Sequence, residues 1–82
     1  MNKISLIKLK KGLKVKILEI TGGKLAARRL TTLGLRPGAC LTKISSFALR
    51  GPVTVKVGST TIALGHGMAE KVLVDARPES CR

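Results

Sequence analysis

The sequence predicts a mainly β protein: a small, highly curved barrel of about five short strands with one short α-helix. Three observations lead to this fold class. Several runs alternate apolar and polar residues with a period of two, one window has the period of a helix, and glycine stands at the corners between runs. Closure of the barrel removes the unpaired edges of short strands. The 82 residues form a single domain, 1–82, with frayed ends expected at 1–5 and 76–82.

The first strand is expected to begin at Lys14, after a lead-in whose leucines pack down while its lysines stay in water. Lys14-Val15-Lys16-Ile17 alternates as a half-buried strand does. The phase changes at Leu18, which indicates either burial on both faces or a bulge near Ile17 and Leu18. Thr21-Gly22-Gly23 ends the strand as a turn.

Residues 24–33 form the one good helix candidate. Ala26, Leu30 and Leu33 fall on a single stripe and are expected to face the core. Gly34 stands where a left-handed residue ends a helix, and Leu35 then contacts Leu30 in a Schellman arrangement.

The remainder of the chain is predicted to be β structure with tight turns. Pro37-Gly38 suits a type II turn, and Gly58-Ser59 suits a two-residue hairpin connection of type II′. Leu41 and, less clearly, Ile44 are expected to point inward. The elements expected here are strands over 40–47, 53–57, 60–64 and 72–74 and one helical turn over 68–71.

The charge balance calls for an acidic partner or surface. Sixteen Lys and Arg stand against four Asp and Glu, for a net charge of +12. The only aromatic residue is Phe47, which excludes functions built on aromatic platforms such as base stacking or polyproline grooves. Specific nucleic-acid recognition is therefore not expected. Nonspecific phosphate binding, an acidic protein and an anionic membrane face stay open.

Cysteine and histidine give little support to metal or redox chemistry. Cys40 and Cys81 could form a disulfide, but Cys81 is next to the last residue, where chain ends usually fray, so two separate thiols in a reducing compartment are expected. No paired spacing typical of a zinc site is present. The weak candidates for surface binding of a transition metal are His66, Glu79 and Cys81, and no cofactor is expected.

The same inventory predicts that the protein is not an enzyme, because no nucleophile, base and orienting group can be assembled. No window approaches the roughly 18 apolar residues of a membrane span, and no secretory signal is recognisable. The expected location is the cytoplasm.

The corner after the helix resembles the signature of the FeoA family, small cytoplasmic partners of the FeoB ferrous-iron transporter. The resemblance rests on Arg28-Arg29-Leu30-x-x-Leu33-Gly34-Leu35-x-Pro37-Gly38, Gly51-Pro52-Val53 and Ile62-Ala63-Leu64. It implies an SH3-like β-barrel and an accessory role in ferrous iron uptake, exerted by binding the cytoplasmic G-protein domain of FeoB. Gly65-His66-Gly67 departs from the family pattern, in which many members carry a basic residue.

The same motifs resemble the C-terminal domain of repressors of the DtxR kind. The alternative function is therefore a basic nucleic-acid-binding or repressor-type regulatory domain. For the transporter partner, the expected contacts are the arginines on and after the helix and on a later loop: Arg28, Arg29, Arg36 and Arg50. The lysines of the lead-in would mainly speed encounter. The oligomeric state stays open.

Overall fold

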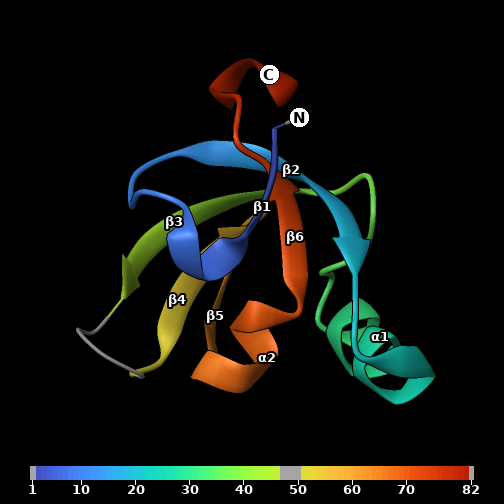
Figure 1. Ribbon diagram of the computed structural model, residues 1–82. Helices are drawn as coiled ribbons and strands as arrows, with labels where there is room; N and C mark the ends of the chain where they lie inside the picture. The colour runs from blue at the N-terminus through green and yellow to red at the C-terminus, as the bar shows by residue number, and fades with distance from the viewer. Residues whose placement is uncertain (1, 47–50, 82) are drawn as a thin grey trace.

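The computed structural model describes residues 2–46 and 51–81. Its strands form one antiparallel sheet in the order β1-β6-β2-β3-β4-β5. Figure 1 shows the sheet curling around a core, with the two α-helices at one end and both chain termini at the other. The elements are β1 (Lys3–Ser5), η1 (Leu6–Lys8), β2 (Lys14–Ile20), α1 (Gly23–Thr32), β3 (Cys40–Ser46), β4 (Val53–Val57), β5 (Thr60–Leu64), α2 (His66–Glu70), β6 (Val72–Asp75) and η2 (Pro78–Ser80).

The mainly β class is confirmed, with one strand more than expected. The extra strand is β1, which pairs with β6 from Lys3 opposite Asp75 to Ser5 opposite Leu73. Frayed ends were expected at 1–5 and 76–82, yet Lys3–Ser5 is paired and Pro78–Ser80 forms η2. Three apolar residues on β1 and η1 supply too little periodicity to be recognised in the sequence.

Strand β2 follows its predicted alternation and its predicted bulge. Val15 and Ile17 are both fully buried. The register against β6 then shifts between Ile17 and Glu19, and Leu18 is left 40% exposed. The phase change in the sequence therefore marks a bulge rather than burial on both faces.

The end of α1 has the predicted Schellman geometry. Gly34 has φ +92°, its N–H donates to the Thr31 carbonyl at 2.9 Å, and the Leu35 N–H donates to the Leu30 carbonyl at 2.8 Å. Leu30 and Leu35 are fully buried, but the prediction that Leu33 faces the core was wrong, because this residue is 46% exposed. The helix ends at Thr32, so Leu33 leaves the core stripe as the cap residue.

The two later turns also have the backbone that their glycines suggested. Gly38 has φ +92° and Gly58 has φ +60°. The Ala39 N–H donates to the Arg36 carbonyl at 3.0 Å, as a turn around Pro37-Gly38 requires. The helical turn predicted over 68–71 is found slightly earlier, as α2.

Strand β3 presents a lysine to the core where the sequence suggested an isoleucine. Lys43 is 2% exposed, whereas Ile44 is 42% exposed. Counting by twos from the buried Leu41 places residue 43 inward, and a bulge between Lys43 and Ser45 then changes the phase.

The buried ammonium of Lys43 fastens the lead-in segment to the barrel. Its Nζ donates to three carbonyls, those of Leu6 at 3.1 Å, Ile7 at 2.9 Å and Leu9 at 2.6 Å. All three protons of the ammonium thus have acceptors. Burial nevertheless lowers the pKa of Lys43 below its usual value, because desolvation disfavours the charged form.

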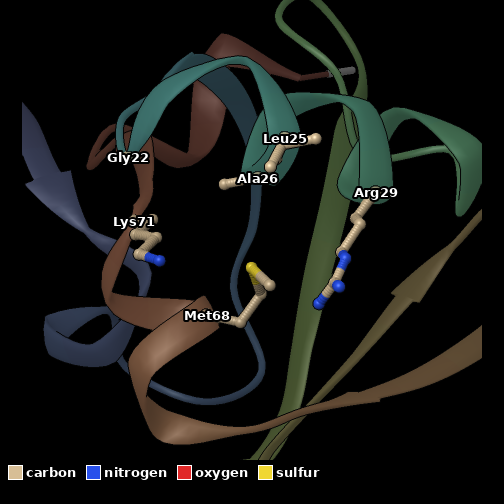
Figure 2. Close-up of a pocket in the computed structure, with 6 residues that line it drawn as sticks. All are labelled: Gly22, Leu25, Ala26, Arg29, Met68 and Lys71. Carbon is tan, nitrogen blue, oxygen red and sulfur yellow. The ribbon is translucent and has the colours of Figure 1, made fainter.

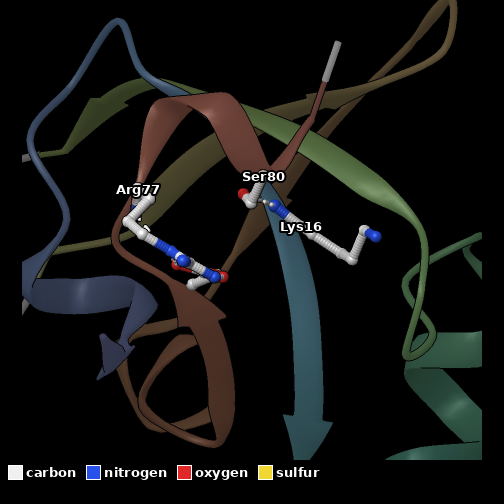
Figure 3. Close-up of polar contacts among 4 residues, drawn as sticks. Lys16, Arg77 and Ser80 are labelled. Carbon is white, nitrogen blue, oxygen red and sulfur yellow. Dashed lines mark hydrogen bonds and ion pairs between the residues drawn. The ribbon is translucent and has the colours of Figure 1, made fainter. Parts of the chain in front are cut away.

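The expectation of two separate thiols was wrong. Cys40 and Cys81 are joined in a disulfide, with 5.9 Å between their Cα atoms. The segment after β6 does not leave the barrel. It folds back across β2, where the Ser80 hydroxyl accepts a hydrogen bond from the Lys16 N–H at 3.0 Å (Figure 3). Cys81 is thereby brought beside the start of β3 and is 8% exposed.

Candidate functional site

An open hollow of about 250 Å³ lies between α1 and α2. Figure 2 shows α1 above the hollow and the chain of α2 below it, with Arg29 and Met68 reaching into the space between them. We call this feature the groove. It is lined by Gly22, Leu25, Ala26, Arg29, Met68 and Lys71.

The groove exists because α1 buries only a narrow stripe. Ala26 and Leu30 are the buried residues of this helix. Leu25 lies off that stripe and is 75% exposed, the largest exposure among the large hydrophobic residues found at the surface. From the other side, α2 contributes Met68, which is partly buried and packs against the core. The groove is therefore lined by apolar side chains together with Arg29 and Lys71.

In the turn before α1, Gly22 has a backbone conformation and surroundings that disfavour any residue with a side chain. Gly22 has φ +92°, and a Cβ at this position would stand 2.6 Å from the Cδ of Lys71. The Lys71 carbonyl in turn accepts hydrogen bonds from the Thr21 N–H at 2.8 Å and the Thr21 hydroxyl at 3.3 Å. The Lys71 side chain lies along one edge of the groove, and a side chain at position 22 would displace it.

The α1 side of the groove is cationic. The α1 sequence holds Lys24, Arg28 and Arg29 and no acid, and Arg36 follows the helix as an exposed residue. Among the described residues, the ion pairs are Lys3–Glu19 and Arg77–Asp75, which lie elsewhere. The guanidinium groups of Arg28, Arg29 and Arg36 make no hydrogen bond to another described residue, and all three arginines are exposed.

The predicted partner-binding residues do not all lie in the groove. Arg29 lines the groove, while Arg28 and Arg36 are exposed nearby on α1 and after it. Arg50 lies outside the described residues. Sequence reasoning missed Leu25, Met68 and Lys71. Leu25 carried a usable signal, because it is an apolar residue off the core stripe of its helix.

The weak metal candidates are not brought together. His66 begins α2, whereas Glu79 belongs to η2, near the C-terminus at the opposite end of the molecule (Figure 1). The sulfur of Cys81 is bonded to Cys40. Within residues 2–46 and 51–81, His, Cys, Asp and Glu form no group of three that could hold a metal ion.

A second hollow, of about 320 Å³, lies beside the lead-in segment. Its cations are lysines on η1 and the chain after it, whereas the groove has an arginine on a helix with a fixed C-terminus. Planar guanidinium groups on a rigid element bind carboxylates with better geometry than mobile ammonium groups. The second hollow is lined by Ile4, Lys8, Leu9, Lys10, Leu13 and Ala76.

Comparison with known families decides what kind of barrel this is. Residues 4–76 match the model of the FeoA domain. The chain belongs to the FeoA family. The resemblance in the sequence is thus confirmed, and with it the association of this small protein with ferrous iron transport.

Solved structures agree with this assignment. An iron uptake regulatory protein (FeoA) is 32% identical, with 90% of this chain and 96% of that chain covered and a TM-score of 0.80. The FeoA of Stenotrophomonas maltophilia, a zinc complex described as a prokaryotic SH3 domain protein, is 28% identical over 89% of this chain and 91% of that one, with a TM-score of 0.74. No curated protein matches the chain.

A repressor shares the fold and no more. A manganese-dependent transcriptional repressor is 19% identical, covers 89% of this chain and 41% of its own, and has a TM-score of 0.80. The SH3-like barrel of this FeoA protein is therefore an architecture that also occurs within a larger regulator.

The described part of the chain contains no helix long and apolar enough to cross a membrane. Zinc is bound by the Stenotrophomonas protein, but the separated donors described above do not fit such a site here.

Proposed function

We propose that this FeoA protein is a non-catalytic interaction module of ferrous iron uptake. In this proposal it binds the cytoplasmic G-protein domain of a FeoB-like transporter at the inner face of the membrane, and the groove is the docking site. The observation that carries the proposal is Leu25, 75% exposed in a groove edged by Arg29 and Lys71. An exposed leucine between two cations is suited to a partner and of no use to the core.

The chemistry of the groove defines the partner surface. An apolar side chain from the partner would pack on Leu25 and Met68, and burying a side chain of leucine size contributes about 1.5–3 kcal/mol. Carboxylates beside it would pair with Arg29 and Lys71, which sets orientation and specificity. Arg28 and Arg36 would add weaker contacts at the rim. The partner is therefore an acidic surface with an apolar side chain at its centre.

The test is the affinity of a purified cytoplasmic transporter domain for the wild-type protein and for charge and shape variants, at two salt concentrations. Leu25→Ser and Arg29→Glu should each weaken binding about tenfold or more, since central contacts dominate interface energies. The loss for Leu25→Ser should persist at high salt, because it removes no charge.

The matched control is Lys10→Glu with Lys11→Glu, a charge reversal in the lead-in segment. These lysines should affect the rate of association and its salt dependence far more than the rate of dissociation. If the lysine variant abolishes binding while both groove variants bind normally, the groove is the wrong face. Duplex DNA in the same assay tests the alternative repressor-type function.

A further inference from the structure

The disulfide joins the last described residue of the chain to the barrel. We call residues 76–81 the clasp segment. It begins at Ala76, whose N–H donates to the Asn2 carbonyl at 2.6 Å. Arg77 is held to Asp75 of β6 by hydrogen bonds from its backbone N–H and its guanidinium group. Beyond Arg77, the described polar contacts from the clasp segment to β2 and β3 are the Ser80–Lys16 hydrogen bond at 3.0 Å and the Cys40–Cys81 bridge.

The strands beneath the clasp segment do not depend on the bridge. β2 and β3 pair with each other through Lys14–Thr42, Val15–Leu41 and Lys16–Cys40. Backbone hydrogen bonds at the ends of this ladder, Ile17 N–H to the Ala39 carbonyl at 2.8 Å and Lys43 N–H to the Leu13 carbonyl at 3.1 Å, belong to the barrel itself. Opening the bridge would therefore free the end of the clasp segment beyond Arg77 and leave the barrel folded.

We propose that Cys40–Cys81 is a reversible thiol–disulfide exchange site that fastens the clasp segment over β2. Its substrate class is a dithiol reductant. One thiolate of the reductant attacks a sulfur of the bridge, the other bridge sulfur leaves as a thiolate, and the second thiol of the reductant resolves the mixed disulfide. Two electrons and two protons pass to Cys40 and Cys81, and the reductant becomes a disulfide.

Reduction changes a defined part of the surface. Directly opposite residues on paired strands face the same side, so Cys40 and Lys16 share the outer face of the sheet. With the clasp segment released, the Lys16 N–H passes from Ser80 to water. The outer face of β2 then becomes more accessible.

The test is amide hydrogen exchange on the full chain, oxidised and after reduction with dithiothreitol. A mass increase of about 2 Da on reduction first establishes that the bridge was present, since two thiol hydrogens are gained. The Lys16 amide and the amides of residues 79–81 should then exchange at least about tenfold faster in the reduced protein. Ile17 and Lys43 serve as internal controls: a lower global stability can speed their exchange, but in the reduced protein they should still exchange more slowly than the Lys16 and clasp-segment amides. Reoxidation with oxidised glutathione should restore the slow exchange.

Two variants separate the bridge from the hydrogen bond. Cys81→Ser should exchange like the reduced wild type with or without reductant. Ser80→Ala should expose the Lys16 amide even when oxidised, while the bridge still forms. The proposal is overturned if reduction leaves the Lys16 and clasp-segment amides unchanged. It is equally overturned if Ile17 and Lys43 become as unprotected as those amides, since the barrel would then unfold without the bridge, or if no mass change is found.

Discussion

At the scale of single residues, the most unusual feature is Lys43, a charged side chain that is buried. Its three carbonyl acceptors belong to η1 and the residue after it, a segment without a sheet partner of its own. The ammonium therefore supplies the hydrogen-bond donors that a neighbouring strand would otherwise offer to these carbonyls. From its hydropathy, a lysine is expected at the surface. The side chain of Lys43 points into the core because of its position in the alternation of β3.

Lys43→Met retains the length of the side chain and removes the three donors. The Ile7 and Leu9 carbonyls would lose their bonds to Nζ, and each buried group left without a partner costs about 1–3 kcal/mol. We expect a loss of about 2–4 kcal/mol in the free energy of unfolding, measured by urea denaturation. Lys56→Met, in the neighbouring strand at an exposed position, is the matched control and should change stability by less than about 0.5 kcal/mol. Equal losses in the two variants would contradict this role of Lys43.

The second residue-scale prediction concerns Asp75 and the dependence of stability on pH. It accepts hydrogen bonds from the Arg77 side chain and backbone, and these bonds lower its pKa to about 2. Since an unfolded aspartate titrates near 3.9, the stabilisation is complete above about pH 4 and is lost as pH falls through about 2. Asp75→Asn should therefore remove this part of the acid sensitivity. Melting temperatures at pH 2, 3 and 5 measure it, and identical pH profiles for the variant and the wild type would refute it.

At the scale of elements, the turns were the features that the sequence predicted best. Gly34, Gly38 and Gly58 each mark a position where positive φ is needed, and φ is positive at all three. Such positions depend on local sterics alone, so a sequence reveals them. The bulge in β3 and the exposed Leu33 were not foreseeable in the same way, because strand register and packing decide them.

The helix C-terminus gives the element-scale prediction. A Cβ on Gly34 would meet only the Val57 Cγ1, at an ordinary 3.7 Å, so the cost of Gly34→Ala is backbone strain rather than a clash. We expect a loss of about 1–2 kcal/mol in the free energy of unfolding. Gly67→Ala is the control, since Gly67 lies inside α2 with open space around it. It should be neutral or stabilising by up to about 1 kcal/mol in the same thermal melts. A Gly34 variant as stable as the Gly67 variant would remove the argument for the cap.

At the scale of the whole molecule, the disulfide joins positions 41 residues apart. The sequence could not reveal it, because the path of the clasp segment across β2 is a tertiary fact. Only the α1 side of the groove was predictable from the sequence, because the other side also depends on tertiary packing. Charge and motif pointed to the arginines of α1, but Met68 and Lys71 come from a distant part of the chain and reach the groove only through the packing of α2.

Closing a loop of this length restricts the unfolded chain by up to about 4 kcal/mol in the chain-entropy model. Dithiothreitol should therefore lower the melting temperature of the wild-type protein by several degrees. The double variant Cys40→Ala, Cys81→Ala should melt at one temperature with and without the reductant. A drop of the same size in the double variant would show that the reductant acts elsewhere.

The central claim is that the groove between α1 and α2 binds an acidic partner domain, and amide chemical shifts measured during a titration test it most directly. The isotope-labelled protein is titrated with the unlabelled cytoplasmic domain of the transporter. We expect the largest shifts to cluster at Gly22, Leu25, Arg29, Met68 and Lys71 and to saturate with the partner. Shifts that saturate on the lysine-rich lead-in and on β2, with the groove amides unmoved, would contradict it.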